Sequence, residues 1–159
     1  MPAAPTPAIA ALIRAKVVFT LHPYHHDPSI TAFGDEVVAA LGWEPERVFK
    51  TLVTSVDGAL VVGIVPVATH LDLKALAAAA GGKKASMAKV ADAERSSGYV
   101  AGGISPLGQR KALPTVIDST AGRFETIMVS AGKRGLQVEL APADLIAACR
   151  AKVADIASD

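Results

Sequence analysis

The dipeptide Asp57-Gly58 constrains the fold of this chain more than any other local feature. It separates two apolar, β-branched segments, Val48 to Ser55 and Ala59 to Val65, each of which is typical of a strand. Asp-Gly tolerates the positive φ angles of a two-residue turn, so this arrangement predicts an antiparallel β-hairpin. A hairpin argues against strict alternation of strands and helices, and therefore against a doubly wound nucleotide-binding sheet.

The rest of the chain predicts helices and short strands around this hairpin. Capping residues, glycine stops and apolar spacing indicate the helices, and short β-branched segments indicate the strands. We expect helices at Thr6 to Lys16, Asp35 to Leu41, Asp72 to Ala80, Val90 to Ser96 and from Pro142 onwards, the last with Leu145, Cys149, Val153 and Ile156 on one face. We expect further strands at Val17 to Leu21, Thr115 to Asp118, Thr126 to Ser130 and Leu136 to Leu140. Together these elements indicate an α+β fold with a largely antiparallel or mixed sheet.

Length and composition fit a single domain. The chain has 159 residues, of which 51% are hydrophobic and 4% aromatic, so a sizeable aliphatic core is expected. We expect residues 1–6, which include two prolines, to form a flexible tail before a domain at residues 7–157. The start lacks the basic region of a signal peptide, and no apolar run approaches the ~20 residues of a membrane span. We therefore expect a cytoplasmic protein without membrane association.

Charge and side-chain content exclude several classes of site. The net charge of +1 provides no global positive field, so any RNA contact must be local. Cys149 is the only cysteine, which excludes a disulfide framework within the chain, and its apolar neighbours indicate a buried structural thiol. His22, His25 and His26 lie close together in sequence, but no pair has the spacing of metal ligands on a helix, so we expect no metal site.

The glycine-rich segment from Gly102 to Gly108 is the strongest candidate for a binding loop. Its glycines and proline disfavour helix and strand, and they allow a ligand to approach the backbone closely. Ser105 is a poor nucleophile candidate, because Pro106 lacks the N–H that would complete an oxyanion hole. The segment is either a set of donors from Gly103, Ile104 and Ser105 for a carbonyl or carboxylate, or a turn that only fixes a bend.

Two basic features are further candidates. Lys50 shares one strand face with apolar Val48 and Leu52, so it is either a charge that protects an edge strand or the cation of a pocket. The segment Ser130 to Gly135 is a glycine-flanked basic turn, which could clamp a phosphate or lie solvated at the surface. The pairs Lys83-Lys84 and Arg110-Lys111 are weaker signals, and we expect them to be solvated.

The remaining titratable residues provide no acid–base pair. No two carboxylates have an obvious catalytic arrangement, and Asp35-Glu36 fits the favourable negative charge at a helix start. Tyr24 could either face a cleft or pack on the core. If the chain is an enzyme, positioning, electrostatics or the substrate itself must carry the reaction.

These segments together resemble the YbaK family of aminoacyl-tRNA deacylases. The resemblance is carried by Phe49-Lys50-Thr51-Leu52, Gly102 through Gly108 and Ser130 through Gly135, in that order and at these separations. Phe33-Gly34-Asp35-Glu36, which leads into a helix, also matches. The similarity runs from about Thr6 to Ile156, and the combination of motifs is specific although each motif alone is weak.

The resemblance implies a fold, an activity and a set of site residues. The expected fold is a curved, mostly antiparallel or mixed, β-barrel-like sheet with surrounding helices. Lys50 corresponds to the functional lysine of the family. The substrate-binding positions implied are Tyr24, Gly102, Gly103, Ile104, Ser105, Pro106, Gly108, Ser130, Gly132, Lys133 and Arg134. Ala131 and Gln137 depart from the family pattern, where glycine and an acidic residue are common. No metal or cofactor is implied.

The implied activity is removal of cysteine that is wrongly attached to tRNA(Pro), with Cys-tRNA(Cys) as a further substrate. In Cys-specific members the thiolate of the substrate attacks its own ester, which fits the missing protein nucleophile. The expected partners are the aminoacyl-tRNA and prolyl-tRNA synthetase, and the expected state is a monomer or weak homodimer. Two alternatives remain open: a deacylase of Ala-tRNA(Pro) or another small aminoacyl-tRNA, and a noncatalytic module that binds tRNA or a synthetase.

Overall fold

The hairpin predicted from Asp57-Gly58 is present. In the computed structural model, which describes residues 5–159, β2 (Phe49–Val56) pairs antiparallel with β3 (Ala59–Pro66) along its whole length. Asp57 and Gly58 have φ angles of 49° and 88°, as a tight hairpin turn of this kind requires. The Asp57 carboxylate accepts hydrogen bonds from the backbone N–H groups of Lys83 and Lys84 at 2.9 and 3.0 Å, which ties the turn to the following chain.

Further strands extend the hairpin into a mixed sheet in the order β5-β2-β3-β6-β9. β5 (Ala85–Met87) adds antiparallel to the turn end of β2, whereas β6 (Thr115–Asp118) and β9 (Lys152–Ala154) continue in parallel from β3. Because β5 reaches only Thr54 to Val56, the first half of β2 has a strand neighbour on one side.

A second sheet is antiparallel and has the order β1-β8-β7. Its strands are β1 (Phe19–Pro23), β8 (Leu136–Leu140) and β7 (Ile127–Lys133). A parallel bridge between Val48 and Met128 joins this sheet to the start of β2. A two-stranded sheet is formed by β4 (His70–Leu71) and β10 (Ala157–Ser158). The pairings among residues 5–159 leave the expected barrel-like sheet open, so the α+β prediction is confirmed without a closed barrel.

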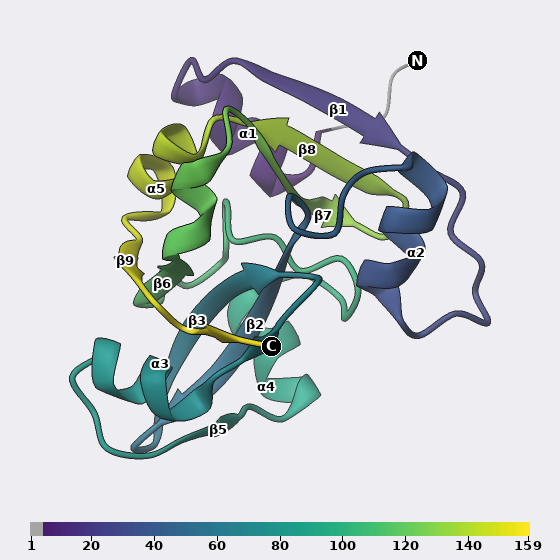
Figure 1. The fold of residues 1–159 in the computed structure, drawn as a ribbon. Helices are drawn as coiled ribbons and strands as arrows, with labels where there is room; N and C mark the ends of the chain where they lie inside the picture. Colours follow the sequence, from purple (N-terminus) through teal and green to yellow (C-terminus); the bar gives the residue numbers. More distant parts are fainter. Residues whose placement is uncertain (1–4) are drawn as a thin grey trace.

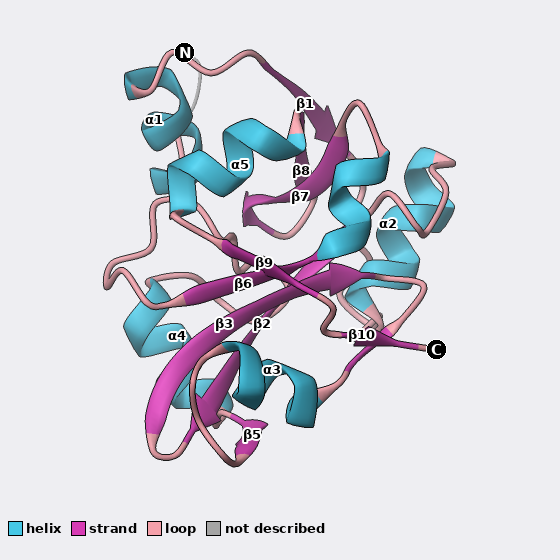
Figure 2. Ribbon diagram, turned by 60° about the vertical axis from the view of Figure 1, so that its left-hand side comes forward, coloured by secondary structure: helices cyan, strands magenta, loops and turns pink. Residues whose placement is uncertain are grey.

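Helices flank both sheets, as Figures 1 and 2 show. They are α1 (Pro7–Arg14), α2 (Phe33–Leu41), α3 (Leu73–Ala79), α4 (Val90–Ser97), the 3-10 helix η1 (Ser119–Arg123) and α5 (Pro142–Cys149). In both views α1 and α5 lie beside the β1-β8-β7 sheet, and α3 lies beside the β2–β3 hairpin. The largest core cluster draws from both sheets and from α1 and α5, with Leu12, Ile64, Ile127 and Leu145 fully buried. The elements therefore form one packed unit.

The helix starts and stops follow local signals. Asp72 caps α3 by accepting a hydrogen bond from the Ala75 N–H at 3.0 Å, and Gly42 ends α2 with a φ of 69°. α2 begins two residues earlier than its predicted start, with Asp35 inside its first turn rather than at the cap. Thr6 caps α1 by accepting from the Ile9 N–H, and its hydroxyl donates to the Ala131 carbonyl. Residues 1–4 of the predicted tail lie outside the described residues.

The chain after Cys149 differs from the prediction of one long final helix. α5 ends at Cys149, because Arg150 takes the left-handed conformation with a φ of 52°. Val153 lies in β9, and Ile156 follows it as a fully buried residue. The Asp118 carboxylate accepts hydrogen bonds from the N–H groups of Ile156 and the next residue, both at 2.9 Å. Pairing with distant partners thus outweighed the helical spacing.

The first strand is also displaced from its predicted position. Val17 to Leu21 was the predicted strand, whereas β1 covers Phe19–Pro23 and includes two residues of the predicted loop. The register with β8 pairs Phe19 with Leu140 and Pro23 with Leu136. The partner strand therefore sets the limits of β1, which the local residue preferences placed too early.

Candidate active site

An apolar cavity of about 360 Å³ lies between α2, the first half of β2 and the glycine-rich loop. Most of its wall is aliphatic or aromatic, including Phe33, Val37, Val48, Phe49 and Val67. Its polar side chains are Lys50, Thr51, Ser130 and Gln137. The lining residues, all within the described part of the chain, include no histidine, cysteine, tyrosine or carboxylate. The cavity therefore suits a small, mostly apolar group that is held by a few polar contacts.

Lys50 is half-buried in the wall of this cavity. It lies on the half of β2 that β5 does not cover, and its Nζ donates a hydrogen bond to the Thr69 carbonyl oxygen at 2.7 Å. Burial lowers the pKa of Lys50, and the negative charge of Asp35 opposes this shift. An ammonium group has three donors, so two remain available for a ligand.

The glycine-rich loop lines the cavity through Gly102 and Ile104. Gly102 has a φ of 84°, and a Cβ at this position would lie 2.6 Å from the Phe33 ring. Its neighbour Gly103 already donates its N–H to the Val100 carbonyl at 2.9 Å. The N–H groups of Gly102 and Ile104 form no hydrogen bond with any of residues 5–159. These two loop N–H groups are therefore unpaired within the described residues.

In the second half of the loop, Ser105, Pro106 and Leu107 are buried. Ser105 is fully buried and does not line the cavity, and its Oγ accepts a hydrogen bond from the Leu107 N–H at 3.2 Å. Pro106 is buried as well, and Gly108 packs so closely that a Cβ there would lie 2.4 Å from the Pro7 carbonyl oxygen. These residues hold the bend, which was the other interpretation of the segment.

The basic turn contacts the glycine-rich loop and the residue before it. Of its residues only Ser130 lines the cavity, and its Oγ accepts from the Gly132 N–H at 3.2 Å. Arg134 donates through Nε to the Ala101 carbonyl at 2.7 Å, and its guanidinium lies 5.0 Å from the centre of the Phe33 ring. Lys133 is exposed.

Glycines and an alanine permit the close contact between the turn and the loop. A Cβ on Gly103 would lie 2.8 Å from the Lys133 Cα, and one on Gly132 would lie 2.9 Å from the Tyr99 ring. Ala131 is fully buried and its φ lies outside the left-handed region, so its side chain is accommodated without strain. The departure from glycine at position 131 therefore does not disturb the backbone.

Tyr24 does not line the cavity. Its N–H donates to the Gly135 carbonyl at 2.9 Å, and its ring packs against a small cluster formed by Val37, Val48 and Met128. The structure therefore brings Lys50, Gly102, Ile104 and Ser130 together. It places Tyr24, Gly103, Ser105, Pro106, Gly108, Gly132, Lys133 and Arg134 outside the cavity lining.

Sequence reasoning missed two polar groups of the cavity wall. The Thr51 hydroxyl is buried and has no hydrogen-bond partner among the described residues. Gln137 is 5% exposed, and its side-chain amide forms no hydrogen bond with residues 5–159. Thr51 neighbours Lys50 in the quoted motif, and Gln137 stands at a departure from the family pattern. Their positions were visible in the sequence, but their place in the cavity wall depends on the tertiary packing of β2 and β8.

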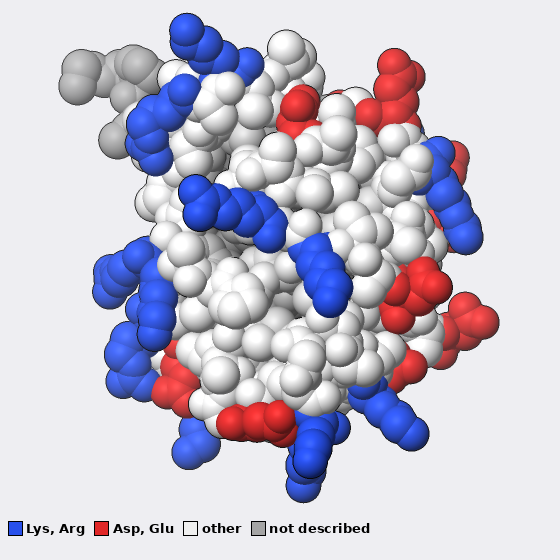
Figure 3. Space-filling view, turned by 90° about the vertical axis from the view of Figure 1, so that its left-hand side faces the viewer, with Lys and Arg blue, Asp and Glu red and all other residues white. Residues whose placement is uncertain are grey.

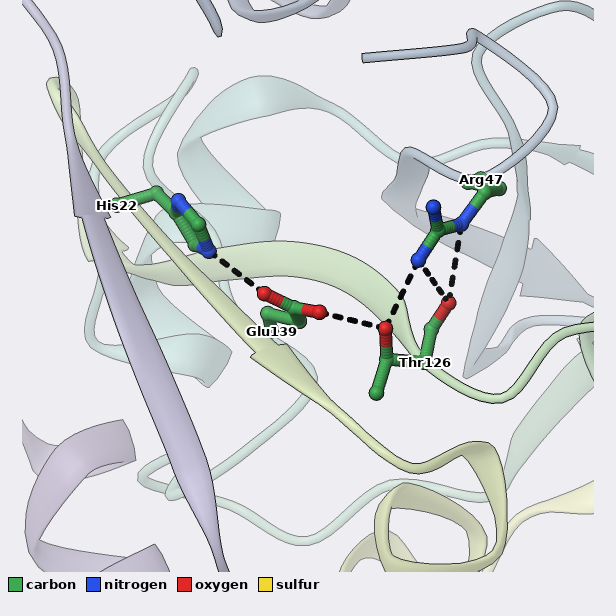
Figure 4. A network of polar contacts seen from close by, with 4 residues as sticks. All are labelled: His22, Arg47, Thr126 and Glu139. Carbon is green, nitrogen blue, oxygen red and sulfur yellow. Dashed lines mark hydrogen bonds and ion pairs between the residues drawn. The ribbon is translucent and has the colours of Figure 1, made fainter.

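Polar residues outside the cavity join the two sheets (Figure 4). The Glu139 carboxylate contacts His22 Nε2 at 2.8 Å and accepts from the Thr126 hydroxyl at 2.6 Å. Arg47 donates to the Thr126 hydroxyl at 2.8 Å and stacks 4.3 Å above the Trp43 ring. Burial would raise the pKa of Glu139, but the hydrogen bonds from Thr126 and His22 outweigh it and lower the pKa. This network anchors the chain just before β2.

Cys149 is a structural thiol in this arrangement. Its Sγ donates to the Leu145 carbonyl at 3.0 Å within α5, and burial raises its pKa to about 11. A thiol with this pKa carries almost no thiolate at neutral pH.

Comparison with known proteins identifies the family. Residues 27–148 match the family described as "Aminoacyl-tRNA editing domain". The chain belongs to this family. It is also 43% identical over 123 residues to an Enterococcus faecalis protein named "Putative Cys-tRNA(Pro)/Cys-tRNA(Cys) deacylase EbsC". The aligned segment covers 77% of this chain and 75% of that protein.

Solved structures agree on the fold of this editing-family member. A protein described as "a putative trans-editing enzyme for prolyl tRNA synthetase" superposes with a TM-score of 0.83 at 23% identity, over 96% of each chain. A crystal structure of a hypothetical protein gives a TM-score of 0.85 at 21% identity, over 96% of this chain and 99% of that chain. Within residues 5–159, none of the helices has the length and apolar character that a membrane span needs.

Proposed function

We propose that this protein is a trans-editing deacylase that clears Cys-tRNA(Pro), and that Cys-tRNA(Cys) is a second substrate. The observation that carries the proposal is the character of the cavity. It is small and apolar, and its described lining residues include one lysine and two loop residues with unpaired backbone N–H groups, but no carboxylate, imidazole or thiol. Membership of the editing family and the name of the Enterococcus relative support the substrate class.

A cavity without a protein base favours chemistry that the substrate supplies. The thiolate of the attached cysteine attacks its own ester carbonyl, so that a C–S bond forms and the C–O bond to the terminal ribose breaks. The thiol proton ends on the ribose hydroxyl of the released tRNA, and the cysteine leaves as a cyclic thioester that water then opens. Among the described side chains of the cavity wall, only Lys50 is charged, which leaves the attack to the substrate.

The protein's contribution is then positioning and electrostatic stabilisation. The N–H groups of Gly102 and Ile104 are free to donate to the developing oxyanion. The two spare donors of Lys50 hold either the terminal phosphate or the aminoacyl carbonyl, while the Thr69 carbonyl fixes the direction of the ammonium group. Apolar residues of α2 and β2 exclude water from the side chain of the substrate.

Replacement of Lys50 tests this assignment. We expect Lys50→Ala to lower kcat/KM for Cys-tRNA(Pro) at least 100-fold while the circular dichroism spectrum and thermal transition stay unchanged. Lys74→Ala is a matched control, because Lys74 is exposed on α3 and does not line the cavity. Wild-type turnover by Lys50→Ala would remove Lys50 from the mechanism.

A panel of charged tRNA(Pro) tests the substrate and the self-attack step. Cys-tRNA(Pro) should be cleared rapidly, whereas Ser-tRNA(Pro) and Ala-tRNA(Pro), which lack the thiol, should decay at the rate without protein. Equal turnover of all three would refute the self-attack mechanism, and preference for Ala-tRNA(Pro) would indicate an alanine-specific deacylase. Decay of Cys-tRNA(Pro) at the rate without protein would favour a noncatalytic binding module.

The expected setting follows from the substrate. A trans-editing enzyme acts where tRNA is charged, so we place it in the cytoplasm with prolyl-tRNA synthetase as a partner, as a monomer or weak homodimer. Co-sedimentation with that synthetase in the presence and absence of tRNA(Pro) tests the association.

A further inference from the structure

A second hollow, lined by basic side chains, lies next to the cavity. Its volume is about 680 Å³. Its basic lining residues are Lys89, Arg95, Arg110 and Lys111, and Asp92 is the one acidic residue among the described residues that line it. Met87 and Ala88, at the end of β5, line both this hollow and the cavity, so the two share a wall. We call it the basic groove.

The backbone holds two of these cations in place without using their side chains. The N–H groups of Arg110 and Lys111 donate to the carbonyls of Ser97 and Ser96, at 2.9 and 3.0 Å. These contacts attach the segment to the C-terminal end of α4 and leave both side chains exposed. Figure 2 shows α4 at the left of the molecule, and in Figure 3, turned further the same way, Lys and Arg side chains gather along the left edge.

The positive charge in this groove is local and largely uncompensated. Arg95 forms an ion pair with Asp92 at 2.5 Å, whereas Lys89, Arg110 and Lys111 form no ion pair with any residue between 5 and 159. The chain as a whole carries a net charge of only +1. On a nearly neutral protein, such a cluster of cations creates no strong long-range field. It favours binding of a polyanion that contacts the cluster directly.

We propose that the basic groove binds the sugar–phosphate backbone of the single-stranded 3′ end of tRNA. The proposal rests on the proposed function, in which the ester on the terminal ribose occupies the cavity. The phosphates of the preceding nucleotides must then leave the cavity over one of its walls, and the wall formed by Met87 and Ala88 leads directly to the cations. Arg110 and Lys111 thus gain a role where the sequence predicted only solvated charges.

The basic turn is a weaker candidate for the same task. The Arg134 Nε is occupied by the Ala101 carbonyl, and its guanidinium packs on Phe33. The basic groove offers three cations without such partners, and it shares Met87 and Ala88 with the cavity wall. Sequence-independent contacts of this kind contribute binding affinity that depends on salt.

Charge reversal tests the proposal by RNA binding. The variant is Arg110→Glu with Lys111→Glu, and the probe is a fluorescent single-stranded RNA that ends in CCA. The control is Lys74→Glu with Arg123→Glu, because these two residues are exposed, carry the same charge and line neither hollow. We expect the groove variant to bind at least tenfold more weakly and the control less than twofold. Two lost phosphate contacts should also reduce the slope of log K against log salt by about 1.4.

Equal binding by the groove variant and the wild type, or an equal loss in both variants, would overturn the proposal. A second measurement uses cysteinyl adenosine, which carries the ester but none of the preceding phosphates. The groove variant should cleave it at the wild-type rate, while its KM for Cys-tRNA(Pro) rises at least tenfold and kcat stays near wild type. Loss of turnover on cysteinyl adenosine would place these residues in the chemistry and overturn their assignment to phosphate binding.

The two proposals can fail separately. Groove-dependent RNA binding by a wild-type protein that cleaves no aminoacyl-tRNA would refute the deacylase assignment and keep the groove. Normal clearance of Cys-tRNA(Pro) by the groove variant, with unchanged KM, would refute the groove and keep the deacylase.

Discussion

The Arg134 Nε lies 2.7 Å from the Ala101 carbonyl oxygen and donates a hydrogen bond to it. This contact joins the basic turn to the residue just before the glycine-rich loop, and the Arg134 guanidinium also covers the Phe33 ring that lines the cavity. Two segments that are separated by about a fifth of the chain are therefore held together by one side chain. The loop presents Gly102 and Ile104 to the cavity from a position that Arg134 fixes.

Arg134→Ala should weaken catalysis by loosening the loop. Loss of a charged hydrogen bond at an exposed position, together with the stacking on Phe33, should reduce the free energy of unfolding by about 1 kcal/mol. We expect kcat/KM for Cys-tRNA(Pro) to fall about tenfold, since about 1.4 kcal/mol corresponds to a factor of ten. Lys133→Ala is the control, because that exposed side chain forms no hydrogen bond or ion pair within residues 5–159. Equal effects of both changes would contradict the anchoring role.

Tyr99→Phe should destabilise the buried half of the same loop. The Tyr99 hydroxyl donates to the Leu107 carbonyl at 2.6 Å, and the side chain is 5% exposed. Removing the donor leaves a buried carbonyl unpaired, which costs about 1–3 kcal/mol in urea denaturation at pH 7.

The effect of Tyr99→Phe should also depend on pH. Burial raises the pKa of Tyr99 from 10.0 to about 12, so its stabilising contribution is complete below pH 10 and is lost as the pH rises through 12. The difference between wild type and Tyr99→Phe should shrink over that interval. A constant difference from pH 9 to pH 12 would show that the hydroxyl does not act in this way.

Thr51→Val should stabilise the protein and impair the enzyme. The buried Thr51 hydroxyl has no partner among the described residues, so its removal should raise the free energy of unfolding by about 1 kcal/mol. We expect kcat/KM to fall about tenfold, because Thr51 lines the cavity and its hydroxyl has no partner among the described residues. Unchanged kcat/KM would show that the substrate does not use it.

Thr54→Val on the same strand provides the matched comparison. The Thr54 hydroxyl is fully buried and donates to the Val61 carbonyl at 2.8 Å, so the same chemical change should destabilise the protein. Opposite signs of the two stability changes are the expected result, measured by urea denaturation of both variants. A loss of stability in both would mean that the Thr51 hydroxyl has a partner in solution.

Glu139→Gln should reduce stability in a pH-dependent way. The hydrogen bonds that lower the pKa of Glu139 against the effect of burial favour the charged carboxylate in the folded state. The Glu139 carboxylate therefore adds to the free energy of unfolding above the pKa of a glutamate in the unfolded chain, about 4.3. This stabilisation is lost as the pH falls through the lower pKa of the folded state. We expect Glu139→Gln to cost about 1 kcal/mol at pH 7 and almost nothing at the acid end of the folded range. Thermal melting from pH 3 to pH 8 measures this, and exposed Glu46→Gln should show no such trend.

The sequence correctly predicted the turns and helix ends that depend only on neighbouring residues. Asp57-Gly58 requires a tight turn, Asp72 supplies a cap, and Gly42 accepts a left-handed φ, so each acts through the residues beside it. The same reasoning failed after Cys149, where the Asp118 carboxylate and the edge of β6 capture a segment with helical spacing. It also placed β1 too early, because β8 sets its limits.

The candidate site was likewise only partly predictable from the sequence. The sequence alone marked Lys50, the glycine-rich loop and the basic turn, and it disfavoured a serine nucleophile because Pro106 lacks an N–H. Only the tertiary structure decided that Ser105 faces inward, that Arg134 supports the loop, and that Phe33, Thr51 and Gln137 complete the cavity wall. The physical reason is that turns and caps depend on neighbouring residues, whereas the direction of a side chain depends on which distant strand or loop packs against it.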